Sequence, residues 1–297
     1  MTAQTIETFD IEVSGTTIHG RTAGDGSPLL LPHGIPEDHR MWDKVVPELV
    51  RHHTVVAADL RGYGSSGTPA SDDRHSPYSM RSLALDQVEL MAALGHKRFA
   101  VAGHDRGARC AYRLALDHQE AVTALCVMDI VPTSHAFRHA EMEFALGYWV
   151  WSFLAAEAPM PERMIEANPA ILVDHMLDSW SSDVSAFSPE ARERYRTQFF
   201  DPARVHAICE QYRAAATLDV EHDEADLGRR KITCPTLVLW SGDGPLSSWY
   251  DPLAVWREWA TDVTGGAIPG GHFMPEESPA QVTSALLDFL TGSSSRL

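Results

Sequence analysis

The residues whose types and spacing are best suited to catalysis lie between positions 99 and 109. A short apolar run there ends in Gly-x-Asp-x-Gly with Asp105 at its centre, and a helical pattern begins at the next residue. This order is typical of a nucleophile elbow, a tight strand-to-helix turn that raises one side chain above a sheet. Glycines flank such a turn because its backbone is unusual and leaves no room for Cβ atoms. A carboxylate in that place can displace a leaving group from carbon, and water must then hydrolyse the resulting ester.

Aspartate is also a common turn residue, so the elbow alone does not separate catalysis from a plain turn. His272, which follows a Gly-Gly pair near the end of the chain, favours catalysis. Nucleophile, acid and histidine then occur in the order of the α/β-hydrolase fold, and His272 would take a proton from water. Two acids could fix its tautomer, Asp129 and Asp243. We favour Asp129, because Asp243 lies in a Ser-Gly-Asp-Gly sequence that could simply form a turn.

Two arginines follow the candidate nucleophile directly. Arg106 and Arg109 lie three positions apart on the predicted helix, so they share a face near Asp105. On an ordinary helix such a pair would more often form surface salt bridges, but beside a nucleophile it suits bidentate binding of a substrate carboxylate. Both would also favour an ionised Asp105. The backbone N–H groups of Ile35 and Arg106 would form an oxyanion hole, with His33 bracing the loop that carries Ile35.

A parallel sheet is needed to bring these residues together. Short apolar runs alternate with helical patterns, which is typical of parallel strands covered on both faces. The runs occupy residues 29–31, 55–58, 99–103, 124–129 and 235–240. Alternating residues 9–13 and the following residues 16–19 predict a hairpin at one edge. Ligands bind beyond the carboxyl ends of such strands, where the candidate residues lie.

Residues 131–231 contain helical patterns and many aromatic residues but no clear strand. We interpret this stretch as a helical lid, or cap, inserted into the sheet. The predicted fold class is therefore α/β, with an α/β-hydrolase core of residues 1–130 and 232–297 and a cap domain of residues 131–231. Ser278 is expected to cap a final helix that has Pro279 in its first turn and ends at Leu290.

Composition excludes several classes of function. Forty-one acidic against 24 basic side chains give a formal net charge of −17, which argues against nucleic acid and anionic membranes as partners. The first residues lack a leader pattern, and no run has the length of a membrane span, so the expected location is cytoplasmic. The cysteines are Cys110, Cys126, Cys209 and Cys234, and they form no C-x-x-C pair, so we expect buried thiols. Because no histidine cluster has metal-ligand spacing, we expect no metal and no cofactor.

Residues 103–109 resemble the elbow of the fluoroacetate (haloacetate) dehalogenases of the α/β-hydrolase superfamily. The resemblance covers nearly the whole chain, with matching motifs at residues 33–36, 59–64, 128–133, 209–214 and 271–277. It implies that Asp105 is the nucleophile, His272 the base and Asp129 its acid. It also implies that Arg106 and Arg109 bind the carboxylate of a small anionic substrate, a haloacid, and that the protein is a homodimer.

The resemblance further implies a halide pocket in the cap, which that family builds from a His-Trp pair and a Tyr. Trp151 and Tyr212 match the Trp and the Tyr, and each carries a polar hydrogen suited to a halide, although cap aromatics also serve plain packing. Val150 stands where the family has its histidine. Because fluoride is a poor leaving group, the lost donor should impair C–F cleavage most. We therefore expect chloroacetate or bromoacetate to be preferred over fluoroacetate.

Two other functions fit parts of the same pattern. An epoxide hydrolase uses the same Asp-His-Asp set but needs two cap tyrosines to protonate the epoxide oxygen, for which Tyr148, Tyr195 and Tyr212 are available. Arg106 beside the nucleophile argues against it, because an epoxide carries no charge. A non-catalytic receptor for a small carboxylate would have no need of a base at His272.

Overall fold

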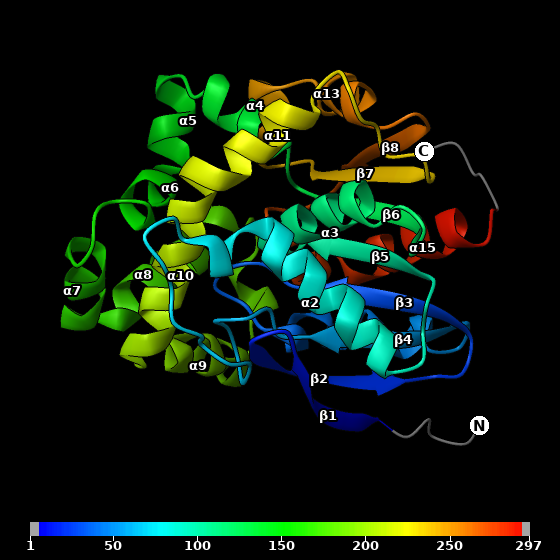
Figure 1. The fold of residues 1–297 in the computed structure, drawn as a ribbon, viewed down its shortest axis with the longest axis horizontal. Coiled ribbons are helices and arrows are strands. Elements are labelled where there is room, and N and C mark those ends of the chain that lie inside the picture. The colour runs from blue at the N-terminus through cyan, green and yellow to red at the C-terminus, as the bar shows by residue number, and fades with distance from the viewer. Residues whose placement is uncertain (1–5, 293–297) are drawn as a thin grey trace.

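The computed structural model describes residues 6–292, and eight strands form one sheet within them (Figure 1). The order is β1-β2-β4-β3-β5-β6-β7-β8. The hairpin of β1 (Glu7–Val13) and β2 (Thr16–Ala23) lies at one edge, and β2 also pairs antiparallel with β4. All other neighbours run parallel, and these strands are β3 (Ser27–Pro32), β4 (His53–Ala58), β5 (Phe99–His104), β6 (Val122–Met128), β7 (Thr236–Ser241) and β8 (Val263–Ile268). The predicted α/β fold with an edge hairpin is confirmed.

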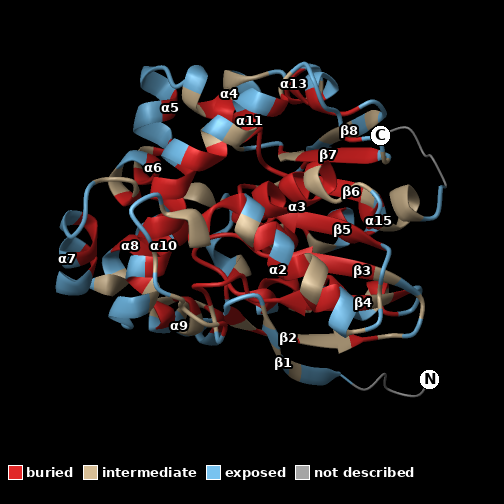
Figure 2. Ribbon diagram, in the orientation of Figure 1, coloured by how far each residue is buried: buried red, intermediate tan, exposed pale blue. Residues whose placement is uncertain are grey.

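Helices cover both faces of the sheet, because the strand residues alternate between two apolar clusters. Leu30 packs in the cluster that holds α2 (Met80–Ala93) and α3 (Arg106–Asp117). Leu29 and Leu31 pack in the opposite cluster. That second face is covered by the 3₁₀ helix η1 (His39–Lys44), α1 (Val46–Leu49) and α15 (Pro279–Leu290). Figure 2 shows the central strands as almost continuously buried, as the apolar runs predict.

Between β6 and β7 the chain forms helices and no strand of the described sheet. In Figure 1 most of them gather at one end of the sheet. They are α4 (Thr133–Arg138), α5 (Met142–Gly147), α6 (Trp149–Leu154), α7 (Met160–Ala167), α8 (Pro169–Trp180), η3 (Val184–Ala186), α9 (Pro189–Gln198), α10 (Pro202–Ala214), the π-helical turn η4 (Ala215–Asp219) and α11 (Val220–Asp226). We propose the division into a core of residues 1–130 and 232–297 and a cap of residues 131–231, of which residues 1–5 and 293–297 lie outside the described part.

The remaining helices connect core elements. They are η2 (Ser76–Tyr78), α12 (Leu246–Trp249), α13 (Pro252–Trp259) and α14 (Met274–Glu277). Ser278 stands at the N-cap of α15 and Pro279 in its first turn, as expected, but the Ser278 side chain accepts no helix N–H; its Oγ donates to the carbonyl oxygen of Pro269 at 2.5 Å. The four cysteines are free thiols, three of them buried and Cys234 half-buried. No helix within residues 6–292 combines the length and the apolar character needed to cross a membrane.

Candidate active site

Asp105 lies in the tight turn between β5 and α3. Its backbone has φ +46°, a conformation that costs a non-glycine residue energy and often marks functional sites. Close backbone contacts explain the glycines on either side. An added Cβ at Gly103 would lie 2.4 Å from the carbonyl oxygen of Gly107, and one at Gly107 would lie 2.3 Å from that of Pro32. A larger residue at Gly107 would therefore push the turn away from β3, and one at Gly103 would push β5 away from α3.

The Asp105 carboxylate is buried between the Ile35 backbone and the His272 ring. Its Oδ1 accepts a hydrogen bond from the backbone N–H of Ile35 at 3.1 Å, and its Oδ2 lies 3.9 Å from His272 Nε2. Burial alone would raise the pKa of Asp105, but the imidazoles of His272 and His104 and the guanidinium of Arg109 outweigh it. The pKa therefore lies below its ordinary value, and the side chain is ionised at neutral pH, as a nucleophile requires.

One ring nitrogen of His272 contacts a carboxylate, and the other has no partner. Its Nδ1 lies 2.6 Å from Asp129 Oδ2, and the other Asp129 oxygen accepts the backbone N–H of Ser241 at 2.9 Å. Its Nε2 is buried and has no hydrogen-bond partner within residues 6–292. Asp243 does not reach His272, because it is exposed and its Oδ2 accepts the backbone N–H of Gly270 at 3.0 Å. The arrangement leaves the Nε2 of His272 without a partner beside Asp105, in a position to receive a proton from water.

Arg106 and Arg109 are buried side by side without carboxylate partners. Neither forms an ion pair with any residue from 6 to 292, and Arg106 Nη1 and Arg109 Nε have no hydrogen-bond partner there. Arg106 Nη2 donates to the Gln211 carbonyl oxygen at 3.1 Å, and Arg109 Nη1 donates to the Val131 carbonyl oxygen at the same distance. Buried guanidinium groups with unused donors are expensive unless an anion completes them. The pair can therefore receive a small carboxylate.

The two candidate halide residues lie over these arginines. The Arg106 guanidinium carbon is 4.5 Å from the ring centre of Tyr212, and that of Arg109 is 4.3 Å from the ring centre of Trp151. The two rings are 6.3 Å apart, and neither the indole N–H nor the phenol hydroxyl donates to a residue within the described range. Val150 is fully buried in α6 and offers no donor. The structure thus brings both rings close to the arginines.

A buried pair that sequence reasoning missed lies behind the site. His104 Nδ1 is 3.2 Å from Glu37 Oε2, and His104 Nε2 is 2.8 Å from the His272 carbonyl oxygen, to which it donates. Burial alone would lower the pKa of His104, but the hydrogen bond and charge of Glu37 outweigh burial and raise this pKa to about 9. Burial raises the pKa of Glu37 to about 7. In the sequence, the only indication that His104 takes part in the site is its position next to Asp105. His33 braces its loop as expected, because its Nε2 accepts the backbone N–H of Leu60 at 3.0 Å.

Aromatic rings surround His272. The ring centres of Phe273, Trp180 and Tyr148 lie 5.1, 5.6 and 6.3 Å from that of His272. Tyr148 is thus the cap tyrosine nearest the base among the three considered. Tyr195, by contrast, donates its hydroxyl to Glu276 Oε1 at 2.7 Å and is occupied.

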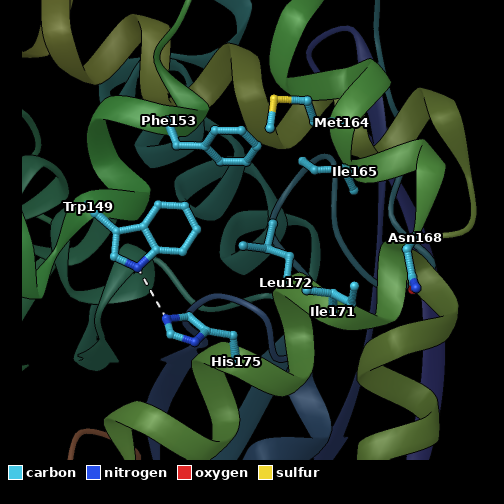
Figure 3. A pocket seen from close by; sticks show the side chains of 8 residues that line it. All are labelled: Trp149, Phe153, Met164, Ile165, Asn168, Ile171, Leu172 and His175. Carbon is cyan, nitrogen blue, oxygen red and sulfur yellow. Dashed lines mark hydrogen bonds between the residues drawn. The ribbon is translucent and has the colours of Figure 1, made fainter.

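A separate cavity of about 350 Å³ opens in the cap between α6, α7 and α8 (Figure 3). It is lined by Trp149, Phe153, Met164, Ile165, Asn168, Ile171, Leu172 and His175. Trp149 Nε1 donates to His175 Nε2 at 3.1 Å. None of the residues predicted to act on substrate lines this cavity.

Comparisons with known proteins agree with the fold. The sequence profile described as alpha/beta hydrolase fold matches residues 27–279. The chain is 41% identical to a fluoroacetate dehalogenase from Burkholderia sp, over 95% of this chain and 92% of that protein. It is 30% identical to a soluble epoxide hydrolase from Corynebacterium sp. (strain C12), over 93% and 94% of the two chains.

A solved structure from Nostoc sp PCC 7120, described as an alpha/beta hydrolase, matches with a TM-score of 0.95. The two chains are 49% identical, and the match covers 96% of this chain and 98% of that one. The profile, the relatives and the eight-stranded sheet with its elbow all agree. The chain belongs to the α/β-hydrolase fold family, and it is a hydrolase.

Proposed function

We propose that this hydrolase is a haloacetate dehalogenase, which converts a short 2-haloacid and water into the 2-hydroxyacid, halide and a proton. The observation that carries the proposal is the buried pair Arg106 and Arg109, which has unused N–H donors and no carboxylate partner beside an ionised Asp105. An uncharged substrate would leave these donors unsatisfied, whereas a carboxylate completes them.

In the first step the arginines hold the substrate carboxylate and so fix the carbon that bears the halogen in front of Asp105. A carboxylate oxygen of Asp105 attacks that carbon, the new C–O bond forms, and the carbon–halogen bond breaks with its electron pair going to the halide. The N–H of Trp151 and the hydroxyl of Tyr212 stabilise the charge that develops on the leaving halide. The product of this step is an ester of Asp105.

In the second step His272 Nε2 takes a proton from water, and the resulting hydroxide attacks the ester carbonyl carbon of Asp105. Asp129 holds the His272 tautomer through the 2.6 Å contact and stabilises the imidazolium. The backbone N–H of Ile35 already lies 3.1 Å from an Asp105 oxygen, and with that of Arg106 it would stabilise the oxyanion. As the intermediate collapses, the C–O bond to the substrate breaks and its oxygen receives the proton from the His272 imidazolium. The hydroxyacid leaves, and the carboxyl group of Asp105 loses its remaining proton to water, which restores the carboxylate.

The proposal includes a halogen preference. Val150 supplies no hydrogen-bond donor, so chloride or bromide should leave more readily than fluoride. The resemblance also supports a homodimer, which light scattering after gel filtration would test through the mass in solution.

A second candidate is epoxide hydrolysis by the same triad. It is supported by the soluble epoxide hydrolase relative and by the position of Tyr148, whose ring centre is 6.3 Å from that of His272. Tyr148 and Tyr212 would then protonate the epoxide oxygen. The unpaired arginines favour the dehalogenase over this alternative and over a carboxylate receptor without catalysis.

One experiment separates the three functions. The purified protein is incubated with chloroacetate and, separately, with styrene oxide, and chloride and diol are measured. Chloride release without diol supports the dehalogenase, and diol without chloride supports the epoxide hydrolase. Chloroacetate binding with neither product would support a receptor.

A further inference from the structure

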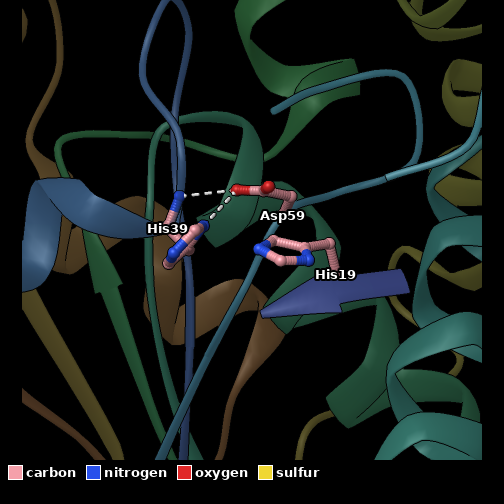
Figure 4. Close-up of side chains that lie close together, drawn as sticks. All are labelled: His19, His39 and Asp59. Carbon is pink, nitrogen blue, oxygen red and sulfur yellow. Dashed lines mark hydrogen bonds and ion pairs between the residues drawn. The ribbon is translucent and has the colours of Figure 1, made fainter. Parts of the chain in front are cut away.

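Three potential metal ligands converge at the edge of the sheet, away from the catalytic residues. They are His19, His39 and Asp59, and Figure 4 shows their side chains facing one another. Each offers one ligand atom, and these atoms all lie within 4.8 Å of one another. His19 comes from β2, His39 begins η1, and Asp59 directly follows β4. These three residues lie far apart in the sequence and match no metal-binding motif, so only the folded structure shows that they form a cluster.

His19 is oriented by a carboxylate on the neighbouring strand. Asp10 in β1 is its register partner, and Asp10 Oδ1 lies 2.8 Å from His19 Nδ1. This contact leaves Nε2 free, and no residue within 6–292 forms a hydrogen bond with it. Metal-binding histidines are usually held in this way by an outer carboxylate, which fixes the tautomer and strengthens the ligand. The side chain of His19 is only 22% exposed, so its position is well constrained.

Asp59 is fixed by backbone contacts on both sides. Its N–H donates to the His19 carbonyl oxygen at 2.9 Å, and its Oδ2 accepts the N–H of Ser65 at 2.8 Å. Its Oδ1 accepts the N–H of His39 at 2.8 Å and lies 2.7 Å from His39 Nδ1. These contacts fix both carboxylate oxygens of Asp59, with Oδ1 beside the His39 ring.

We propose that His19 Nε2, His39 Nδ1 and Asp59 Oδ1 bind one divalent transition-metal ion of the zinc class. Two imidazoles and a carboxylate suit such an ion and do not suit calcium or magnesium, which prefer oxygen ligands alone. With three protein ligands, water completes the coordination. The ion displaces the proton that lies between His39 Nδ1 and Asp59, and the neutral ring then carries its proton on Nε2.

The distances require a modest contraction. A tetrahedral zinc ion with ligands at ~2.0–2.2 Å separates its ligand atoms by about 3.4 Å. The longest separation, at most 4.8 Å, must therefore shorten by up to about 1.4 Å, through rotation of the His39 ring and a small shift of His19 that keeps its contact with Asp10. The 2.7 Å between His39 Nδ1 and Asp59 Oδ1 must lengthen by about 0.7 Å. The ion would join β2 to the segment that starts at His39, four residues after the oxyanion donor Ile35. Its binding should stabilise that edge of the fold.

The test is a calorimetric titration of the full chain, stripped with chelator, with ZnCl₂. We expect one site of micromolar or tighter affinity, weakened at least tenfold by His19→Gln and by His39→Gln. Asp10→Asn keeps all three ligands and should weaken binding about tenfold through the lost outer contact. The matched control is His52→Gln, because His52 is an exposed histidine elsewhere and its loss should change nothing.

Cobalt spectroscopy separates a lost ligand from a lost fold. Co²⁺ should give visible ligand-field bands with the native chain that disappear in His19→Gln, while His19→Cys should retain binding and add a sulfur-to-cobalt charge-transfer band. Absence of Zn²⁺ binding at 100-fold excess over a micromolar constant overturns the proposal. It is also overturned if His19→Gln and His39→Gln bind normally, or if His272→Asn alone abolishes binding, which would locate the ion at the catalytic residues.

Discussion

His104 and Glu37 form a fully buried pair, with His104 Nδ1 3.2 Å from Glu37 Oε2. The pair joins three segments that the chemistry needs. Glu37 belongs to the loop that carries Ile35, His104 precedes Asp105, and the other His104 nitrogen donates to the His272 carbonyl oxygen at 2.8 Å. A shift of either residue would therefore move the oxyanion donor, the nucleophile and the base relative to one another.

This pair should make the stability of the fold depend on pH. The folded pKa of His104, about 9, lies above its ordinary 6.5, so the folded protein binds this proton more tightly than the unfolded chain. Its contribution is fully present below pH 6.5 and is lost as the pH rises through 9. We expect the melting temperature of His104→Gln to change less between pH 6.5 and 9.5 than that of the native chain. The double variant Glu37→Gln/His104→Gln is the control without a buried charge, and equal pH profiles for native and His104→Gln would contradict the assignment.

Asp105→Asn should abolish halide release at neutral pH, because an amide is a far weaker nucleophile than a carboxylate. His272→Asn should instead stop the reaction after the first step. Mass spectrometry of the His272→Asn protein after haloacetate treatment should show Asp105 heavier by the alkyl acid. Continued turnover with an unmodified Asp105 would exclude the ester mechanism.

Arg106→Lys and Arg109→Lys should each weaken haloacetate binding, because lysine keeps the charge but loses the planar set of donors. A hydrogen bond to a charged group contributes about 1.5–3 kcal/mol, so kcat/KM should fall about 10- to 100-fold. The control is Arg81→Lys, whose side chain is 45% exposed and pairs with Asp117 outside the site. An arginine whose replacement leaves kcat/KM unchanged does not hold the substrate carboxylate.

Val150→His should raise fluoroacetate turnover more than chloroacetate turnover. A donor aimed at a concentrated charge in the transition state contributes about 2.7–4 kcal/mol, and the charge on fluoride is more concentrated than that on chloride. Fluoride and chloride release by the native chain and the variant are compared under identical conditions. Val150→Leu is the control for a bulkier side chain without a donor. If the native chain already turns over fluoroacetate as fast as chloroacetate, Val150 does not determine the halide.

The parts predicted well from sequence have local causes. The elbow is visible because Gly103 and Gly107 sit where backbone leaves no space for a side chain, and the sheet is visible because strands buried on both faces are continuously apolar. The proximity of Asp129 and His272 follows from strand ends meeting at one edge of a parallel sheet. These features are consequences of short stretches of chain or of a general rule of topology.

The features that were missed depend on contacts between distant segments. Glu37 and His104 are 67 positions apart, and nothing in the residues around either one indicates the other. Likewise the cap tyrosines could not be ranked, because only packing shows that Tyr195 is occupied by Glu276 while Tyr148 lies near His272. The hydrogen bond of the Ser278 hydroxyl has the same origin: the place of Ser278 at the N-cap was predictable, but the bond to the carbonyl oxygen of Pro269 depends on the fold.

The position of the cap in the chain has a consequence for how this enzyme could change in evolution. Asp129 ends the segment before the cap, and the N–H of Ser241, beyond the cap, holds it from the adjacent strand at 2.9 Å. The register of Met128 with Leu239 closes this junction independently of the helices between them. Insertions, deletions or exchange of residues 131–231 could therefore alter the surroundings of Asp105 while the pairing of Asp129 with β7 is inherited unchanged. The cap and the sheet beneath it can in this sense diverge at different rates within one chain.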